Sequence, residues 1–419
     1  MTDIAPGAPA LEEERHASWA ELFFDLVAVA GVGMLSHVLS SHLDLATVGL
    51  YAVLFLSFWL TWATFMLYGN VAAGRTHLVR LLAGMFGLGV MASAIPGVAH
   101  AVLEGGDSHD LQVYAIAYVA TRWVGSQSWQ RGEVLVDFPV AQHLAGTVPW
   151  VVSFWADGQA LPWLWGGGIL LDLFVMFVVS GDDMVERYQA RIDENRRHGR
   201  DRRRGRPTQG DGPVFHGVSV DAAHLAERLG LFVIIVLGES VVQVVDAAAD
   251  PEPDRALFGA GVASFALLAG MFGLSVLHGH AGLPHLAPGR LTTRAQMALH
   301  CLVTGDIATI AVVLAVVVER SQEALDDPRR WLLCAAVTAY FLLGLVASVV
   351  TRGLRPLATV WWLVTGVAVP IALGAWGADL SGTLLVWILA AVLMLHLWAE
   401  RAQGPAVVPT EVTEPQDLT

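Results

Sequence analysis

Residues 224–246 read HLAERLGLFVIIVLGESVVQVVD, a long apolar run with charged residues near both ends. A helix needs about 20 mainly apolar residues to cross the hydrocarbon core of a bilayer, so this stretch is long enough to span a membrane. At a rise of 1.5 Å per residue, Glu239 lies about 18 Å further along such a helix than Glu227. The stretch therefore predicts a membrane-spanning helix that carries one carboxylate, that of Glu239, deep in the bilayer.

Similar apolar stretches recur along the whole chain of 419 residues. Hydrophobic residues make up 55% of the sequence and charged residues 15%, with a mean hydropathy of +0.56. Charged residues are too few to cover a soluble globule of this size. We therefore predict an all-α polytopic integral membrane protein with about twelve transmembrane helices. Their predicted ranges are 19–40, 46–69, 79–102, 111–125, 138–155, 161–181, 221–245, 256–278, 294–318, 330–351, 356–376 and 382–400.

An arginine-rich stretch divides these segments into two groups of six. We predict an N-terminal tail (1–18), a first half (19–186), a linker (187–216), a second half (217–403) and a disordered C-terminal tail (404–419). The halves resemble each other weakly at a separation of about 206–217 residues. The matching positions include Glu21 with Glu227, Arg80 with Arg294, and Pro139 with Pro356. This pattern predicts two six-helix pseudo-repeats in the same orientation, related by an axis along the membrane normal.

The composition excludes several classes of membrane protein. All 24 basic residues are arginine, and the chain has no lysine. A P-loop ATPase needs the lysine of its phosphate loop, and a retinal protein needs a lysine amine for its Schiff base, so both are excluded. Cys301 and Cys334 are far apart and form no CxxC motif. We predict no cofactor.

The arginines are unevenly distributed among the loops. Most of them lie in the tails and the even-numbered loops, which by the positive-inside rule predicts that both termini lie in the cytoplasm. The linker is either a solvated cytoplasmic loop or a contact for anionic lipid, and we expect no nucleic-acid binding. The residues for the lipid contact are Arg196, Arg197, Arg202, Arg203 and Arg204.

Charged side chains inside the spans are the candidates for function, because each is costly to place in a bilayer. Glu21 and Asp25 are four residues apart, so they lie on one face of the first helix and repel unless a cation, a proton or an arginine is shared. They form either a cation or proton site, or a structural arrangement in which Asp25 pairs with an arginine of another helix. Further candidates for a translocation path or polar core are Glu227, Arg228, Glu239, Asp172 and Asp306.

Glu239 is the strongest single candidate. It serves either translocation or a structural bond that locks helices together. Gly238 precedes it and, lacking a side chain, is expected to let another helix approach closely. No HExxH, CxxC or GxSxG motif is present, so the usual metallohydrolase and serine-hydrolase signals are missing. A metal held by His, Asp and Glu residues from separate helices stays open, and the sequence does not assign its ligands.

Three motifs carry a resemblance to a known family. They are ELFFDLV at Glu21–Val27, FWLTWATFMLYGN at Phe58–Asn70 and ERLGLFVIIVLGES at Glu227–Ser240. Together they resemble the bacterial low temperature requirement A (LtrA) family, over about residues 18–400. The resemblance implies a protein of many helices in the plasma membrane of a bacterial cell, named for growth at low temperature, without an established molecular activity. The family positions kept here are Glu21, Phe24, Asp25, Glu227, Arg228, Gly230, Gly238 and Glu239, whereas Val71 follows Asn70 where the family often has arginine.

Two classes of function fit these observations. The first is a secondary transporter or ion-translocating protein, in which a path between the halves is lined by Asp25 and Glu239. The second is a membrane-embedded enzyme or sensor that depends on a metal or a lipid head group. We expect translocation of protons, cations or a small molecule rather than catalysis. A purely structural role of the charges is a third possibility.

Overall fold

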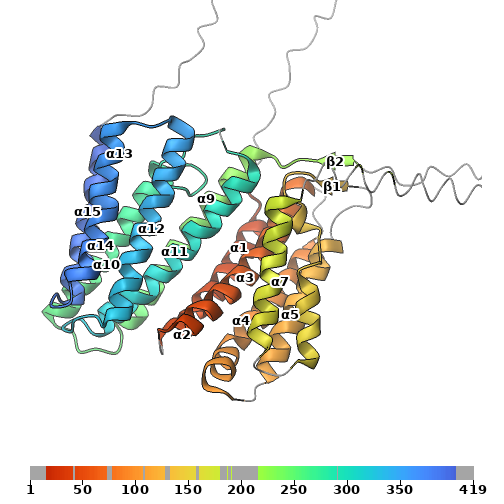
Figure 1. Cartoon of the computed structure of the whole chain (residues 1–419), viewed down its shortest axis with the longest axis horizontal. Helices are drawn as coiled ribbons and strands as arrows, with labels where there is room; N and C mark the ends of the chain where they lie inside the picture. Colours follow the sequence, from red (N-terminus) through yellow and green to blue (C-terminus); the bar gives the residue numbers. More distant parts are fainter. Residues whose placement is uncertain are drawn as a thin grey trace, which may run out of the picture.

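The computed structural model describes residues 16–40, 43–72, 78–106, 109–127, 133–156, 160–179, 186, 190, 216–289 and 291–402. The helices form two bundles that lie side by side, with α1 and α9 where the bundles meet (Figure 1). The first bundle contains α1 (Trp19–Met34), α2 (Ser36–Ser40), α3 (Leu45–Ala72), α4 (Leu78–Glu104), α5 (His109–Gln127), the short 3-10 helices η2 (Pro139–Ala141) and η3 (Ser153–Trp155), α6 (Thr147–Val152) and α7 (Leu161–Val178).

The second bundle contains two helices with π-helical segments. It consists of α9 (Ala222–Ala247), α10 (Arg255–Phe272) with its π-helical continuation η4 (Gly273–Leu277), α11 (Thr293–Glu319), α12 (Asp327–Arg352), α13 (Pro356–Trp362), the π-helical segment η5 (Leu363–Ala368), α14 (Val369–Trp376) and α15 (Gly382–Ala402). The chain enters α1 and leaves α15 at the same end of the molecule (Figure 1), which we call the terminal end.

The class of fold is confirmed as an all-α multi-pass membrane architecture. Within the described ranges, nine helices are long and apolar enough to cross a membrane: α3, α4, α7, α9, α10 with η4, α11, α12, α13 to α14, and α15. The other three of the twelve predicted segments have different forms. Segment 19–40 is divided between α1 and α2, and segment 111–125 forms α5, which carries Arg122 and several polar residues.

The fifth predicted segment, 138–155, is not a continuous helix. It is divided into η2, α6 and η3, because Pro139 and Pro149 lack the N–H groups that a continuous helix needs and Gly146 lies between them. Irregular backbone inside a membrane must find partners within the protein. Arg122 on α5 supplies them, since its Nη2 donates to the carbonyl oxygens of Val140 (3.4 Å) and His143 (3.2 Å).

Polar contacts also join the two bundles at the terminal end. The strands β1 (Glu133–Leu135) and β2 (His216–Val218) form a parallel pair. At the end of α3, the Asn70 side chain donates to the carbonyl oxygen of Asp221 (3.0 Å) and accepts from its N–H (2.8 Å). Asp221 in turn caps α9, because its side chain accepts from the N–H groups of Ala223 and His224. The start of α9 is thus fixed to the end of α3.

The predicted linker and its arginines fall almost wholly outside the described residues. These ranges include Glu186 and Ala190 and resume at His216, the first residue of β2. Arg196, Arg197, Arg202, Arg203 and Arg204 all lie in the interval that is not described.

We expect Asn70→Ala to lower the stability of the protein, because it removes both partners of the Asp221 backbone. The loss of unfolding free energy should be about 0.5–1.5 kcal/mol, the usual net contribution of a hydrogen bond, because Asp221 is exposed and water can replace part of what is lost. Thermal melting of the purified protein in detergent measures it. Ser93→Ala is the control, since the exposed Ser93 hydroxyl bonds only to the carbonyl of Val90 in its own helix. Equal melting temperatures for the two variants would contradict this role of Asn70.

Candidate functional site

A buried ion pair joins the two bundles where α1 meets α9. Arg228 on α9 donates to both carboxylate oxygens of Asp25 on α1, from Nη2 to Oδ1 at 2.6 Å and from Nε to Oδ2 at 3.0 Å. Both residues are at most 1% exposed. The indole Nε1 of Trp62 on α3 donates to Asp25 Oδ1 at 2.7 Å, so three helices meet at this carboxylate. The geometry is the two-pronged arrangement that makes arginine–carboxylate pairs strong.

Glu21 extends this cluster by one turn toward the terminal end. Its Oε1 lies 3.1 Å from Nη1 of Arg228 and 3.4 Å from Nε2 of His224, and all three side chains are buried. Its Oε2 accepts from the N–H of Ser18 at 2.8 Å and closes a capping box at the start of α1. One guanidinium thus lies between two buried carboxylates.

A layer of aromatic rings lies next to the ion pair. His300 on α11 places Nε2 at 3.2 Å from the carbonyl oxygen of Leu229, and Nδ1 at 3.5 Å from Nε1 of Trp59. A carbonyl oxygen only accepts, so Nε2 carries the hydrogen and Nδ1 accepts from the indole. The imidazole is therefore neutral, and it stacks on the Trp62 ring with 5.5 Å between the ring centroids. These packed rings fill the boundary between α3, α9 and α11.

Glu239 lies against α1, as Arg228 does, but without an ion pair. It is half-buried, and the one hydrogen bond to its carboxylate within the described residues comes from Gln243 Nε2 at 3.5 Å. Its Oε1 occupies the space beside Gly33, where a Cβ atom would come within 2.2 Å of it. At Gly238 a Cβ atom would meet no described atom within 4 Å. The expected close approach at Gly238 is therefore wrong, because Gly33 on the opposite helix provides the space.

Asp306 on α11 is a second carboxylate without a cationic partner in the part of the chain that the structure describes. Its Oδ2 is buried and has no hydrogen-bond partner there. It lies close enough to Tyr51 on α3 and Tyr340 on α12 to interact with them electrostatically. One turn further along α11, Thr309 Oγ1 lies 3.4 Å from the Tyr51 hydroxyl. Asp306 thus also lies where the two bundles meet.

Asp172 belongs to a separate cluster inside the first bundle. Its Oδ2 accepts from Arg122 Nη2 at 3.2 Å and from the Tyr118 hydroxyl at 3.3 Å. Arg122 also donates to Thr64 Oγ1 at 2.5 Å, in addition to the carbonyls of the broken fifth segment. The pair therefore holds irregular backbone in place, and the contacts give Asp172 no place at the boundary between the bundles.

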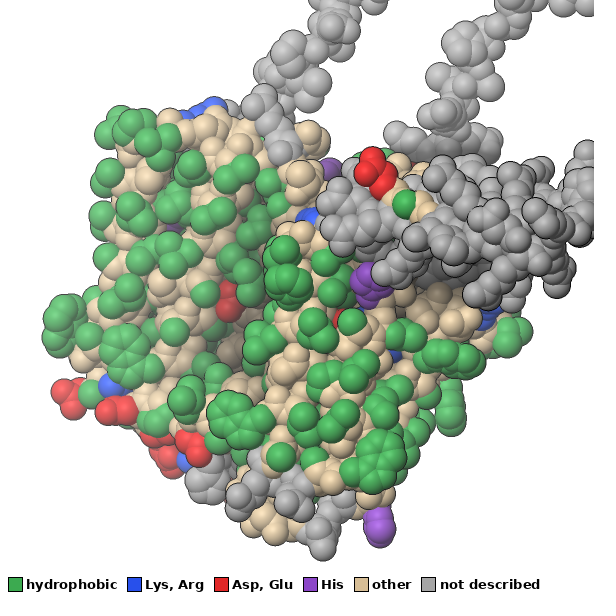
Figure 2. Space-filling view, turned by 45° about the vertical axis from the view of Figure 1, so that its right-hand side comes forward, with side chains coloured by type: hydrophobic (Ala, Val, Ile, Leu, Met, Phe, Trp, Pro, Cys, Tyr) green, Lys and Arg blue, Asp and Glu red, His purple; other side chains and the backbone are tan. Residues whose placement is uncertain are grey.

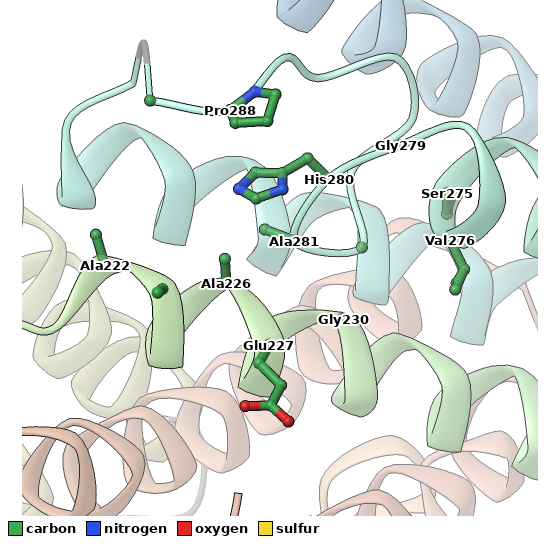
Figure 3. Close-up of a pocket in the computed structure, with 13 residues that line it drawn as sticks. Ala222, Ala226, Glu227, Gly230, Ser275, Val276, Gly279, His280, Ala281 and Pro288 are labelled. Carbon is green, nitrogen blue, oxygen red and sulfur yellow. The ribbon is translucent and has the colours of Figure 1, made fainter. Parts of the chain in front are cut away.

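Glu227 lies at the edge of a pocket of about 550 Å³ near the terminal end. The pocket separates the first turns of α9 from the loop that follows η4. Figure 3 shows His280 and Ala281 on the loop side, whereas the Glu227 carboxylate extends from the opposite side of α9. That carboxylate lies 3.4 Å from Nδ1 of His16. Most of the side chains around the pocket are small, and burial lowers the pKa of His280, so the pocket presents little charge.

Sequence reasoning did not identify Trp62 or His300 as partners of these charges. Both residues lie in apolar runs, and which ring meets which carboxylate depends on how the helices pack. Within the described residues, no group of three or more His, Cys, Asp and Glu side chains is placed to hold a metal ion.

Comparison of the sequence with models of protein families gives a match over most of the chain. The profile described as bacterial low temperature requirement A protein (LtrA) matches residues 16–397, which include both α1 and α9 and nearly the whole chain. The chain belongs to the LtrA family. The match confirms the resemblance carried by the three motifs, and it assigns no molecular activity. No curated protein and no solved structure matches the chain.

We expect Arg228→Gln to cost about 3–5 kcal/mol of unfolding free energy, because it leaves the buried Asp25 carboxylate without its cation. Asp25→Asn should cost less, because Arg228 keeps Glu21 as a partner. The double variant should lose less than the sum of the two single variants. Thermal melting of all four proteins in detergent completes the cycle. As the control, Asp326→Asn removes one partner of the partly exposed Arg329–Asp326 pair (2.9 Å) and should cost less than about 1 kcal/mol. Strict additivity of the two single losses would contradict the coupling.

Gly33→Ala should disturb Glu239, because the added Cβ would occupy the space of its carboxylate. Overpacking of this kind lowers stability by about 1–3 kcal/mol. Gly238→Ala is the matched control on the facing helix. It meets open space and should leave stability unchanged or raise it by up to about 1 kcal/mol through its better helix propensity. Melting temperatures that fall equally in both variants would show that Gly33 has no such role.

Proposed function

We propose that this LtrA-family protein is a secondary transporter or ion-translocating protein, with a path at the boundary between its two halves. The observation that carries the proposal is Glu239, a half-buried carboxylate inside a spanning helix whose described contacts include no cation. Such a carboxylate is costly in a membrane unless it binds a proton or a cation. In the space-filling view, an acidic side chain is visible at mid-height where the two halves meet (Figure 2).

The similar packing of the two halves supports two pseudo-repeats. In the first half α1 packs on α3 and α4, and α4 packs on α5; in the second half α9 packs on α10 and α11, and α11 packs on α12. We infer that the halves are copies of one six-segment unit.

This repeat would place Glu239 on the axis between the halves. Glu21 and Glu227 are 206 positions apart, and so are Gly33 and Glu239. If two halves are related by a twofold axis, equivalent residues that touch each other must lie on it. Gly33 and Glu239 do touch. Transporters built from repeats bind their substrate at the interface between the repeats, which favours translocation at this point.

We also propose that the terminal end faces the cytoplasm of a bacterial cell. Acidic side chains gather at the opposite end of the second half (Figure 2), where Asp254, Glu319, Glu323, Asp326 and Asp379 lie. Among the described residues, Arg80, Arg294, Arg352, Arg355 and Arg401 lie at the terminal end, and Arg255, Arg320, Arg329 and Arg330 lie at the opposite end. The proposal is supported by this small excess and by the further arginines of the linker sequence. We also propose that the linker arginines contact anionic lipid, which is consistent with this orientation.

Flux through proteoliposomes tests the function. We expect wild-type protein to dissipate an imposed proton or cation gradient, read with a pH-sensitive dye, and Glu239→Gln to reduce the flux to that of protein-free vesicles. The variant keeps an acceptor for Gln243 and breaks no ion pair, so it should fold. Glu319→Gln, at the exposed far end of α11, is the matched control and should transport normally. Normal flux in folded Glu239→Gln, or none in wild type, would contradict the proposal.

The alternative is a membrane-embedded enzyme or sensor that depends on a metal or a lipid. Its metal-dependent form requires near-stoichiometric metal in the purified protein, which elemental analysis measures directly. A metal-free, active preparation would remove the metal-dependent form of this alternative.

A further inference from the structure

A carboxylate other than Glu239, that of Asp306, lies at the boundary between α3 and α11. Asp306 comes directly after Gly305, where a Cβ atom would lie 3.1 Å from the Phe55 ring of α3, so the two helices approach closely. Three residues after Asp306, the Thr309 hydroxyl contacts the hydroxyl of Tyr51 on α3. Asp306 therefore lies beside a tight contact between the halves, with one buried oxygen that has no hydrogen-bond partner within the described residues.

The surroundings of Asp306 favour a proton over a metal ion. A bound sodium ion needs several oxygen ligands turned toward it, but the described hydroxyls near Asp306 are held in place by other hydrogen bonds. Thr309 donates to the carbonyl of Gly305 at 2.8 Å, and the Tyr340 hydroxyl bonds to Ser275 at 2.7 Å and to the Met271 carbonyl at 3.2 Å. The described charged side chains form no ion pair with Asp306. A carboxyl group in these surroundings avoids the cost of a buried charge by keeping its proton.

The position of Asp306 also relates it to Glu239. Leu229 on α9 contacts His300 on α11, and both helices run away from the terminal end. Counted from this contact at 1.5 Å per residue, Asp306 lies about 9 Å and Glu239 about 15 Å further from the terminal end. Asp306 and Glu239 thus differ in depth by about 6 Å and lie on neighbouring helices.

We propose that Asp306 is a proton-binding site that carries its proton while α3 and α11 are in contact. The neutral acid lets Phe55 pack on Gly305 and Tyr51 meet Thr309. Release of the proton leaves a carboxylate in this contact and favours its opening to water. The proton is then the ion that is taken up and released at the boundary between the halves. That last step rests on the proposed translocation, whereas the protonation of Asp306 does not.

Infrared spectroscopy of the full-length protein in nanodiscs tests the protonation without any flux measurement. A protonated carboxylic acid has a C=O band above the amide I region, which a carboxylate lacks. We expect this band at mildly acidic to neutral pH in wild type and its loss in Asp306→Asn. Tyr51→Phe should shift the band, because it changes a group beside the acid. Asp379→Asn, which removes an exposed carboxyl group between α14 and α15, is the control and should leave the band unchanged.

Three results would overturn the assignment. The first is an Asp306→Asn spectrum that equals wild type in the carboxylic acid region. The second, which decides the matter if Asp306→Asn does not fold, is a band that Tyr51→Phe leaves unmoved. The third is disappearance of the band when sodium replaces potassium at constant pH, which would show a sodium site instead. A confirmed band with no proton flux would retain the site and refute only the translocation.

Discussion

The bidentate pairing of Arg228 with Asp25 is the constraint on which the rest of the boundary between the halves depends. Neither charge tolerates burial alone, so α1 and α9 must meet at this level and in one rotation. Once this level and rotation are fixed, the later turns of α1 and α9 also face each other in a fixed register. Gly33 comes to face Glu239, and His224 comes to face Glu21. The same pairing holds Trp62 on Asp25 and, through its ring, His300 on α11. One ion pair thus sets the relative positions of four helices from both halves.

The embedded charges fall into two groups with different physical roles. Asp25, Arg228, Arg122 and Asp172 are nearly inaccessible and pair with each other, and Arg122 also supplies the bonds that the broken fifth segment cannot make within itself. Each of these charges thus has an oppositely charged partner inside the protein. Glu239 and Asp306 differ because the structure gives them no cation within the described residues, although both lie inside spanning helices. A protein gains no stability from such groups, so binding of an exchangeable ion is the simplest reason for their presence.

The sequence predicted the elements well and their partners poorly, for a physical reason. Apolar length alone identifies a spanning helix, and the predicted segments match the observed helices except where Leu35 and the prolines around Gly146 interrupt them. The three motifs also sufficed to indicate the family. Partners depend instead on the rotation and neighbours of each helix, which an apolar run does not encode. For this reason the sequence indicated Gly238 and not Gly33, although Gly33 is the glycine whose missing side chain leaves space for the Glu239 carboxylate. Likewise, nothing in the sequence distinguished the paired Asp172 from the unpaired Asp306.

The positions of these contacts indicate which parts of the boundary are able to separate. Near the terminal end, parting α1 from α9 would break the buried Asp25–Arg228 pair, at a cost of about 3–5 kcal/mol. Further from that end, the contacts are a glycine beside Glu239, Phe55 on Gly305 and one long hydroxyl contact at 3.4 Å. These are weaker, and two of the three lie beside a carboxylate whose charge would favour water. If the proposed translocation is correct, we expect the halves to rock about the ion pair and to open at the far end, with the proton on Asp306 keeping the boundary closed.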